Sequence, residues 1–193
     1  MKTLQKTLLA LVAGSLMSVG AQAAVSYNAG QAYAGVKVGQ YSPDESGVDD
    51  ATSYGVYGGY KFTPEFGVEA EYLTTTDGDI EYSAAVDSEY SADVYGIYAT
   101  YDYAFPNTAL YAKGRVGFAK NEIDIDISNK VLDVNASTSI SDTNIAGGIG
   151  LGYNLTPLAS IEAMYNIYPT IEGDDGVEDL DVSGITLGAH YKF

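Results

Sequence analysis

Few residues in this chain of 193 could carry out chemistry. It has no cysteine and one histidine, which excludes disulfides, thiolate nucleophiles and any metal site built on several histidines. The histidine, His190, lies three residues before the last one and shares a strand parity with Lys192 and nearby glycines. We interpret it as a hydrogen-bonding residue. Because no nucleophile–base pair accompanies it, we predict no catalytic residue and no enzyme activity.

Two short motifs invite a ligand-binding interpretation. The segment Asp124–Ser128 begins like a calcium loop, but Asn129 and Asn135 replace the glycine and glutamate that such a loop needs. Its alternating Asp and Ile favour the end of a β-hairpin, and weak divalent-cation binding by acidic segments stays open. The glycine run Gly147–Gly152 lacks the lysine of a phosphate loop and lies inside an alternating segment. We therefore predict no metal site and no cofactor.

The charged residues divide into an excess of acids and a small balanced set. The chain has 26 acidic and 9 basic residues, a formal net charge of −17, which argues against a nucleic-acid partner. Nine charged residues recur on glycine-rich strand faces: Lys37, Lys61, Glu69, Glu71, Asp102, Lys113, Arg115, Glu162 and Lys192. Buried charges need partners. These nine residues therefore predict an ion-paired interior.

The elements that would position these residues are strands. Hydrophobicity alternates with a period of two along residues 32–41, 54–62, 66–75, 93–104, 110–120, 143–155, 160–169 and 183–193. Short proline-marked turns at 63–65, 105–108 and 156–159 separate these segments, as do long polar connections, in which most acids lie, at 42–53, 76–92, 121–142 and 170–182. The pattern predicts an all-β fold, an eight-stranded antiparallel up-and-down transmembrane barrel with short periplasmic turns and long extracellular loops.

The faces of the strands indicate which side meets lipid. One face is rich in glycine, which suits the narrow inside of a small barrel. The other face is apolar and carries aromatic residues near the strand ends, as in the aromatic girdles of membrane barrels: Tyr54, Tyr60, Phe62, Phe66, Tyr72, Tyr101, Tyr103, Phe105, Tyr153 and Tyr191. A secreted soluble barrel with an apolar ligand is the alternative.

The first residues are typical of a secretory leader. Lys2 and Lys6 precede an apolar stretch from Leu8 to Val19, and Ala21-Gln22-Ala23 fits a cleavage site. We predict a signal peptide at residues 1–23 and one barrel domain at 24–193. Removal of the two lysines makes the mature chain more acidic still.

These features resemble the eight-stranded outer-membrane barrels, which include the opacity-type proteins and the barrel domain of outer membrane protein A. The resemblance rests on the leader, the eight segments, the run Gly147–Tyr153 and the ending Tyr191-Lys192-Phe193. It implies a Gram-negative outer membrane location, contact with lipid and lipopolysaccharide, and an insertion signal at Tyr191 and Phe193 for the barrel-assembly machinery. Some similar barrels remodel lipid A with a His near the outer leaflet, whereas His190 falls at the opposite end.

Three classes of function follow from this reading. The first is a structural or adhesion-like surface protein, expected to be a monomer, whose acidic loops contact a host or environmental ligand. The second is a narrow porin-like channel for ions or small solutes, although eight strands leave an interior filled by side chains. The third, a lipid-modifying enzyme, is the least favoured.

Overall fold

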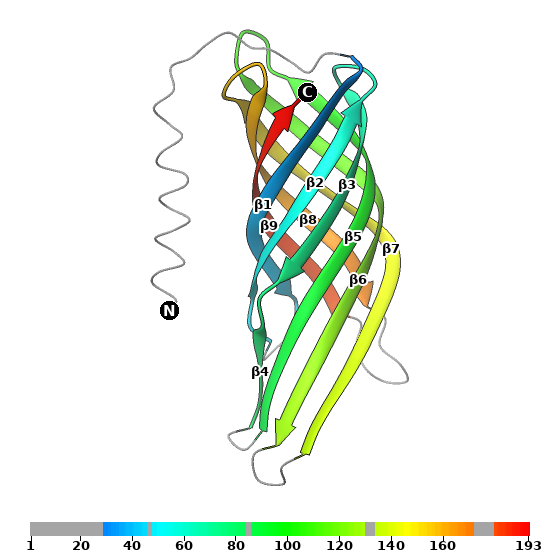
Figure 1. The fold of residues 1–193 in the computed structure, drawn as a ribbon, viewed down its shortest axis with the longest axis vertical. Helices are drawn as coiled ribbons and strands as arrows, with labels where there is room; N and C mark the ends of the chain where they lie inside the picture. The colour runs from blue at the N-terminus through cyan, green and yellow to red at the C-terminus, as the bar shows by residue number, and fades with distance from the viewer. Residues whose placement is uncertain (1–28, 46–47, 84–85, 130–133, 172–179) are drawn as a thin grey trace.

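A computed structural model describes residues 29–45, 48–83, 86–129, 134–171 and 180–193 (Figure 1). The expected signal peptide, residues 1–23, lies outside the described residues. None of the described residues forms a helix long and apolar enough to cross a membrane.

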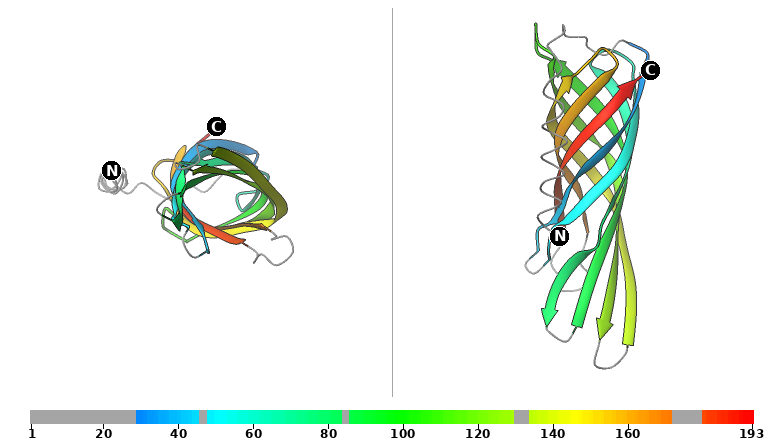
Figure 2. Two further views of the ribbon diagram at one scale, coloured as in Figure 1. Left: turned by 90° about the horizontal axis from the view of Figure 1, so that it is seen from below. Right: turned by 60° about the vertical axis from the view of Figure 1, so that its left-hand side comes forward.

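The regular elements of the described residues are antiparallel strands that close into a barrel. They are β1 (Gln31–Pro43), β2 (Ala51–Lys61), β3 (Phe66–Thr75), β4 (Gly78–Ser83), β5 (Val86–Ala104), β6 (Leu110–Asn129), β7 (Val134–Asn154), β8 (Ala159–Ile171) and β9 (Leu180–Lys192). Strands adjacent in the chain pair with each other, except that β3 pairs with β5 and not with β4, and β1 pairs with β9 to close the barrel. Because β4 continues along β5 beyond β3, eight strands surround the lumen, as the end-on view shows (Figure 2, left). The predicted eight-stranded barrel is confirmed.

Three short turns lie at one end of the barrel, where β1 begins and β9 ends; we call this the termini end. Two of the turns share a Thr-Pro start, and the threonine hydroxyl organises both. Thr63 Oγ1 accepts from the Phe66 amide at 2.9 Å, and Thr156 Oγ1 accepts from the Ala159 amide at 3.0 Å. The third turn contains Asn107, whose φ of 59° lies in the left-handed region that asparagine tolerates. The predicted short turns are therefore confirmed.

The opposite end, which we call the sheet end, differs from the sequence prediction. Two of the four expected long loops, 76–92 and 121–142, are mostly strand. β5, β6 and β7 are 19, 20 and 21 residues long, and their ladders run on to the pairs Val86↔Asn129 and Asn129↔Val134. Alternating Ile and Asp from Ile123 onward suits a strand, but the acidic content favoured a loop reading. The expected hairpin at 124–128 is confirmed. With β4, these strands form a protruding sheet beyond the barrel (Figures 1 and 2).

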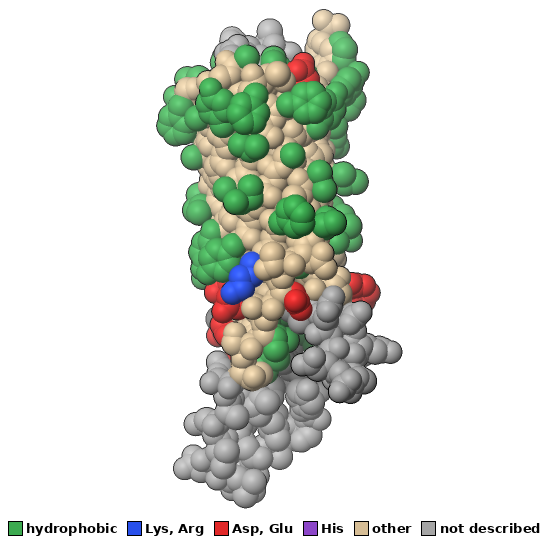
Figure 3. Space-filling model, turned by 90° about the vertical axis from the view of Figure 1, so that its right-hand side faces the viewer, with side chains coloured by type: hydrophobic (Ala, Val, Ile, Leu, Met, Phe, Trp, Pro, Cys, Tyr) green, Lys and Arg blue, Asp and Glu red, His purple; other side chains and the backbone are tan. Residues whose placement is uncertain are grey.

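The barrel wall is apolar outside. Ile97 and Ile149 are both 70% exposed, whereas the inward side chains of Lys61 and Lys192 have no exposed surface. The space-filling view shows hydrophobic side chains spread over the wall, with most of the visible charged side chains toward its lower edge and an acidic one at the top (Figure 3). All ten predicted girdle aromatics are exposed or partly exposed. Such a surface is favourable only against lipid, which rules out the soluble-barrel alternative.

Glycines inside the barrel make room for tyrosine rings. A Cβ at Gly59 would lie 2.5 Å from the Tyr33 ring, and one at Gly152 would overlap the ring of Tyr111. By contrast, Gly114 faces outward and a Cβ there would meet nothing within 4 Å. The glycine-rich face is therefore inward, as predicted, and its glycines are filled by aromatic rings from neighbouring strands.

Candidate functional site

The interior of the barrel has two layers, a charged layer toward the termini end and an apolar layer toward the sheet end. The charged layer is centred on Arg115 of β6. Its guanidinium donates to Glu69 Oε1 at 3.0 Å, to Glu71 Oε2 at 2.8 Å and Oε1 at 3.0 Å, and to Asn166 Oδ1 at 2.7 Å. The glutamates are on β3 and Asn166 is on β8, and neither strand is a neighbour of β6. These contacts therefore cross the lumen.

The lysines extend this charged layer. Lys37 Nζ lies 2.5 Å from Glu71 Oε2, and Lys113 Nζ lies 2.5 Å from Glu69 Oε2 and 3.2 Å from Glu162 Oε2. Six of the nine predicted interior charges thus form one connected cluster across the lumen: Lys37, Glu69, Glu71, Lys113, Arg115 and Glu162.

The second group lies at the termini end. Lys61 Nζ is 2.9 Å from Asp102 Oδ2, and Lys192 Nζ donates to Asn154 Oδ1 at 2.5 Å. All nine predicted residues are buried, with no more than 6% of any residue exposed. The structure therefore brings together the carboxylates and cations that strand parity placed inside.

Sequence analysis missed the tyrosines that complete the charged layer. Tyr33 donates to Glu69 at 2.8 Å and Tyr98 donates to Glu71 at 2.6 Å, so each glutamate is held by cations and a phenol. The Arg115 guanidinium also lies 4.1 Å from the centre of the Tyr98 ring. Strand parity could have placed both tyrosines inside the barrel, because they share the parity of the inward charges. They fill space that interior glycines leave.

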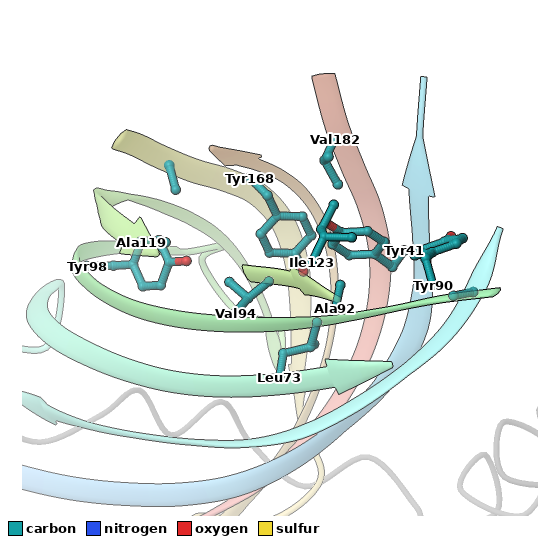
Figure 4. Close-up of a cluster of buried hydrophobic side chains, with 12 residues drawn as sticks. Tyr41, Leu73, Tyr90, Ala92, Val94, Tyr98, Ala119, Ile123, Tyr168 and Val182 are labelled. Carbon is teal, nitrogen blue, oxygen red and sulfur yellow. The ribbon is translucent and has the colours of Figure 1, made fainter. Parts of the chain in front are cut away.

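The apolar layer was not predicted. Its buried residues are Tyr41, Ala51, Leu73, Tyr90, Ala92, Val94, Tyr98, Ala119, Ile123, Ala146, Tyr168 and Val182. Figure 4 shows these side chains converging between the strands. Every one of the eight barrel strands contributes at least one of them, so the packed layer draws on the whole circumference of the barrel. The rings of Tyr41 and Tyr168 stack at 5.8 Å, and Tyr41 donates to Asn121 at 2.9 Å.

Tyr90 is a residue of the apolar layer that lies in the protruding sheet, where it pairs with Gly78 of β4. Burial, followed by the charges of Asp50 and Asp49, raises the pKa of its phenol. The phenol therefore keeps its proton and donates to the Asp49 carbonyl at 2.6 Å. This bond ties β5 to the connection between β1 and β2.

The protruding sheet carries acids on its outer face. Asp93 of β5 stands directly opposite Glu122 of β6, and Asp124 follows on the same face. Tyr72 donates to Asp93 at 2.9 Å, and Lys120 lies 2.7 Å from Glu122. Like charges opposite each other weaken a strand pair. The hydrogen bond from Tyr72 and the ion pair with Lys120 offset part of this repulsion.

Comparison with known proteins agrees with this geometry. The family model of the outer membrane protein beta-barrel domain matches residues 9–193. The chain belongs to this family. No curated protein matches it.

Solved structures of outer-membrane barrels share the fold. Ail, the attachment invasion locus protein of Yersinia pestis, is 21% identical with a TM-score of 0.59, and the match covers 86% of this chain and 99% of Ail. OprG from Pseudomonas aeruginosa is 18% identical with a TM-score of 0.58, covering 87% of this chain and 98% of OprG. Neisserial surface protein A is 16% identical with a TM-score of 0.54, covering 84% and 96%. These likenesses show the shared fold, and the family makes the protein an outer-membrane β-barrel.

Within this outer-membrane barrel, one arrangement resembles a catalytic triad. Ser160 stands opposite His190, and Glu162 Oε2 lies 3.9 Å from His190 Nδ1. However, the Ser160 hydroxyl donates to Asn154 Oδ1 at 2.7 Å, and His190 Nδ1 is within 2.9 Å of the Tyr57 hydroxyl. Ser160 is 1% exposed, so a substrate has no access to it. The geometry is that of an interior hydrogen-bond network.

The ending of the chain lies at the termini end of the barrel. Phe193 is 72% exposed and its ring contacts that of Tyr191, with centroids 5.4 Å apart. The Phe193 amide donates to the Ala32 carbonyl at 2.9 Å. Both rings therefore face outward beside β1. The role of Tyr191 and Phe193 as an insertion signal stays a prediction.

Proposed function

We propose that this barrel is a surface-interaction protein whose protruding sheet stands outside the cell and meets its ligands there. The observation that carries the proposal is the length of β5, β6 and β7, which run far beyond the apolar wall. A barrel that only had to span the membrane would need strands of about 9–11 residues. The extra length builds an ordered surface in water.

The orientation follows the usual construction of such barrels, in which short turns and both termini are periplasmic. The termini end has the three short turns, so we place the protruding sheet on the extracellular side. The signal peptide at residues 1–23 and assembly through the barrel-assembly machinery complete this proposal. We expect a monomer, because the barrel closes on itself and leaves no open edge within the membrane.

The interior argues against the channel alternative. A packed apolar layer with a residue from every barrel strand lies toward the sheet end. Next to it, toward the termini end, lies an ion-paired layer whose contacts cross the lumen. Opening a path would require both layers to separate, which would leave buried charges without partners. In this proposal the side chains in the lumen stabilise the barrel, and the extracellular surface binds the ligands.

The charge of the chain limits which ligands fit. Ail has been solved in complex with the heparin analogue sucrose octasulfate, a polyanion. This chain has a formal net charge of −17, so we do not extend that ligand class to it. Lipopolysaccharide would contact it through its lipid chains and through bridging cations. We propose that the surface ligands of this protein are neutral or cationic.

Trimming the protruding sheet tests the proposal. Ile123 and Ile140 pair across β6 and β7, so residues 124–139 can be replaced by an Asn-Gly turn that closes the hairpin at this pair. We expect cells with the trimmed protein to bind an epithelial monolayer and a polystyrene surface about fivefold or more weakly than cells with the full chain. Equal amounts of folded barrel, seen as the heat-modifiable band on a gel, are the control. Unchanged binding to both surfaces would refute the surface-interaction role.

A further inference from the structure

The protruding sheet has a free edge along β7. β7 pairs with β8 only from Gly147 to Asn154, yet it pairs with β6 as far as Val134. Among the described residues, 134–146 therefore have a strand on one side only. Figures 1 and 2 show this part of β7 at the margin of the sheet.

A single hydrogen bond fixes which backbone groups face the free edge. The Ile145 amide donates to the side chain of Asn144 at 2.8 Å, so it is not part of the ladder with β6. In an antiparallel strand the amide and carbonyl of every second residue point to the same side. The amides and carbonyls of Ser139, Ser141 and Thr143 therefore also point toward the free edge.

This edge has few of the features that usually block strand addition, and Asp142 is the one charged residue among residues 134–146. Residues 134–146 include no proline and no lysine, and the ladder with β6 runs through them without a bulge. Ser139, Ser141 and Thr143 are exposed. The edge is therefore a flat template for an extended chain.

The charges beside the edge indicate which chain fits. Ser139 lies opposite Asp124, and Ser141 lies opposite Glu122, with each pair on one face of the sheet. A strand added to β7 would lie about 10 Å from β6, two strand spacings away. The small serines leave space for a lysine or arginine of that strand to extend over them to Asp124 or Glu122. Two such residues would stand at alternate positions of the added strand.

We propose that the edge of β7 at residues 138–146 binds an extended segment with basic side chains at alternate positions, by adding it as a strand. The proposal rests on the proposed function and names the partner chemistry of the same sheet. A second copy of this chain is a poor occupant, because it would bring two acidic sheets together.

The test uses the full chain in detergent micelles and a fluorescent nine-residue peptide of alternating lysine and threonine. Ser141→Pro removes an amide that faces the edge without removing a bond to β6. Ser141→Ala keeps the amide and is the matched control. We expect Ser141→Pro to bind the peptide at least tenfold more weakly than the full chain, and Ser141→Ala to bind it equally well. Retention of the heat-modifiable band shows that both variants fold.

Charge variants test the second part of the proposal. Asp124→Asn should weaken peptide binding about threefold at low salt, whereas Glu65→Gln, an exposed acid at the termini end, should leave it unchanged. A peptide of the same composition with its lysines in one block should bind more weakly than the alternating peptide. Equal binding by Ser141→Pro, or equal binding of the block peptide, would reduce the effect to electrostatic adsorption and overturn the proposal. A dimer of the full chain that Ser141→Pro abolishes would also overturn it, because the occupant would then be a second copy.

The outcomes separate this inference from the proposed function. If trimming residues 124–139 abolishes surface binding but Ser141→Pro binds the peptide as the full chain does, the edge proposal fails and the surface role stands. If trimming has no effect on surface binding, the surface role fails whatever the peptide does.

Discussion

Replacing Arg115 by alanine should lower the free energy of unfolding by about 3–5 kcal/mol, the usual cost of breaking a buried charge network. The guanidinium donates to Glu69, Glu71 and Asn166, and its removal takes one cation from two buried carboxylates. Among the described residues, each carboxylate would then keep only one lysine and one tyrosine. The midpoint of urea unfolding in lipid vesicles measures the effect. Because the residues of the apolar layer are unchanged in this variant, its ion leak across a planar bilayer should stay at the wild-type level.

Lys120→Ala is the matched control for Arg115→Ala. It removes a cation from the same strand and breaks the contact with Glu122, but the Lys120 side chain is 44% exposed. Exposed ion pairs contribute little to stability. The unfolding midpoint of Lys120→Ala should therefore stay close to that of the wild type. Equal midpoints for Arg115→Ala and the wild type would mean that the interior network does not stabilise the barrel.

Gly152→Val should prevent or slow assembly and destabilise whatever barrel forms by about 1–3 kcal/mol, as overpacking does in a filled core. A Cβ at position 152 would overlap the ring of Tyr111, which is 3% exposed and whose hydroxyl donates to Glu162 at 3.4 Å. The yield of the heat-modifiable form and its urea midpoint measure the two effects.

Gly114→Val gives the same change of volume on the lipid-facing side. Nothing lies within 4 Å of the position that its Cβ would take, so we expect folding and stability close to the wild type. A Gly114→Val barrel that is as unstable as Gly152→Val would indicate that the loss of glycine from the strand, rather than the ring beneath it, causes the damage.

Strand parity predicted most of what lies inside the barrel. Side chains alternate faces with a period of two, so Lys113 and Arg115 could be placed inward from one short segment, together with the glycines that face them. Their partners could not be predicted. Glu69 is 46 residues from Arg115 in the chain and reaches it across the lumen. Which residues meet across the lumen depends on the shear of the barrel, which no local pattern specifies.

The sheet end was the part that sequence analysis described least well. Leu73, Val94 and Tyr168 share the inward parity of the charges, but the inward face was treated as polar, so the apolar layer was missed. The segments 76–92 and 121–142 were treated as loops because acids are rare in buried strands. Acids are acceptable in a strand when one face of the sheet is in water, and Glu122 and Asp124 lie on such a face.

The central claim is that the lumen is closed and that the protein works through its surface. Recording the current through planar bilayers that contain the purified wild-type barrel tests this most directly, with insertion verified by the heat-modifiable band of the same preparation. We predict no steady current above the leak of the bilayer, because the apolar layer contains residues from every barrel strand and the ion pairs on its termini side cross the lumen. Large, steady currents that scale with the amount of inserted protein would contradict the account and favour a channel.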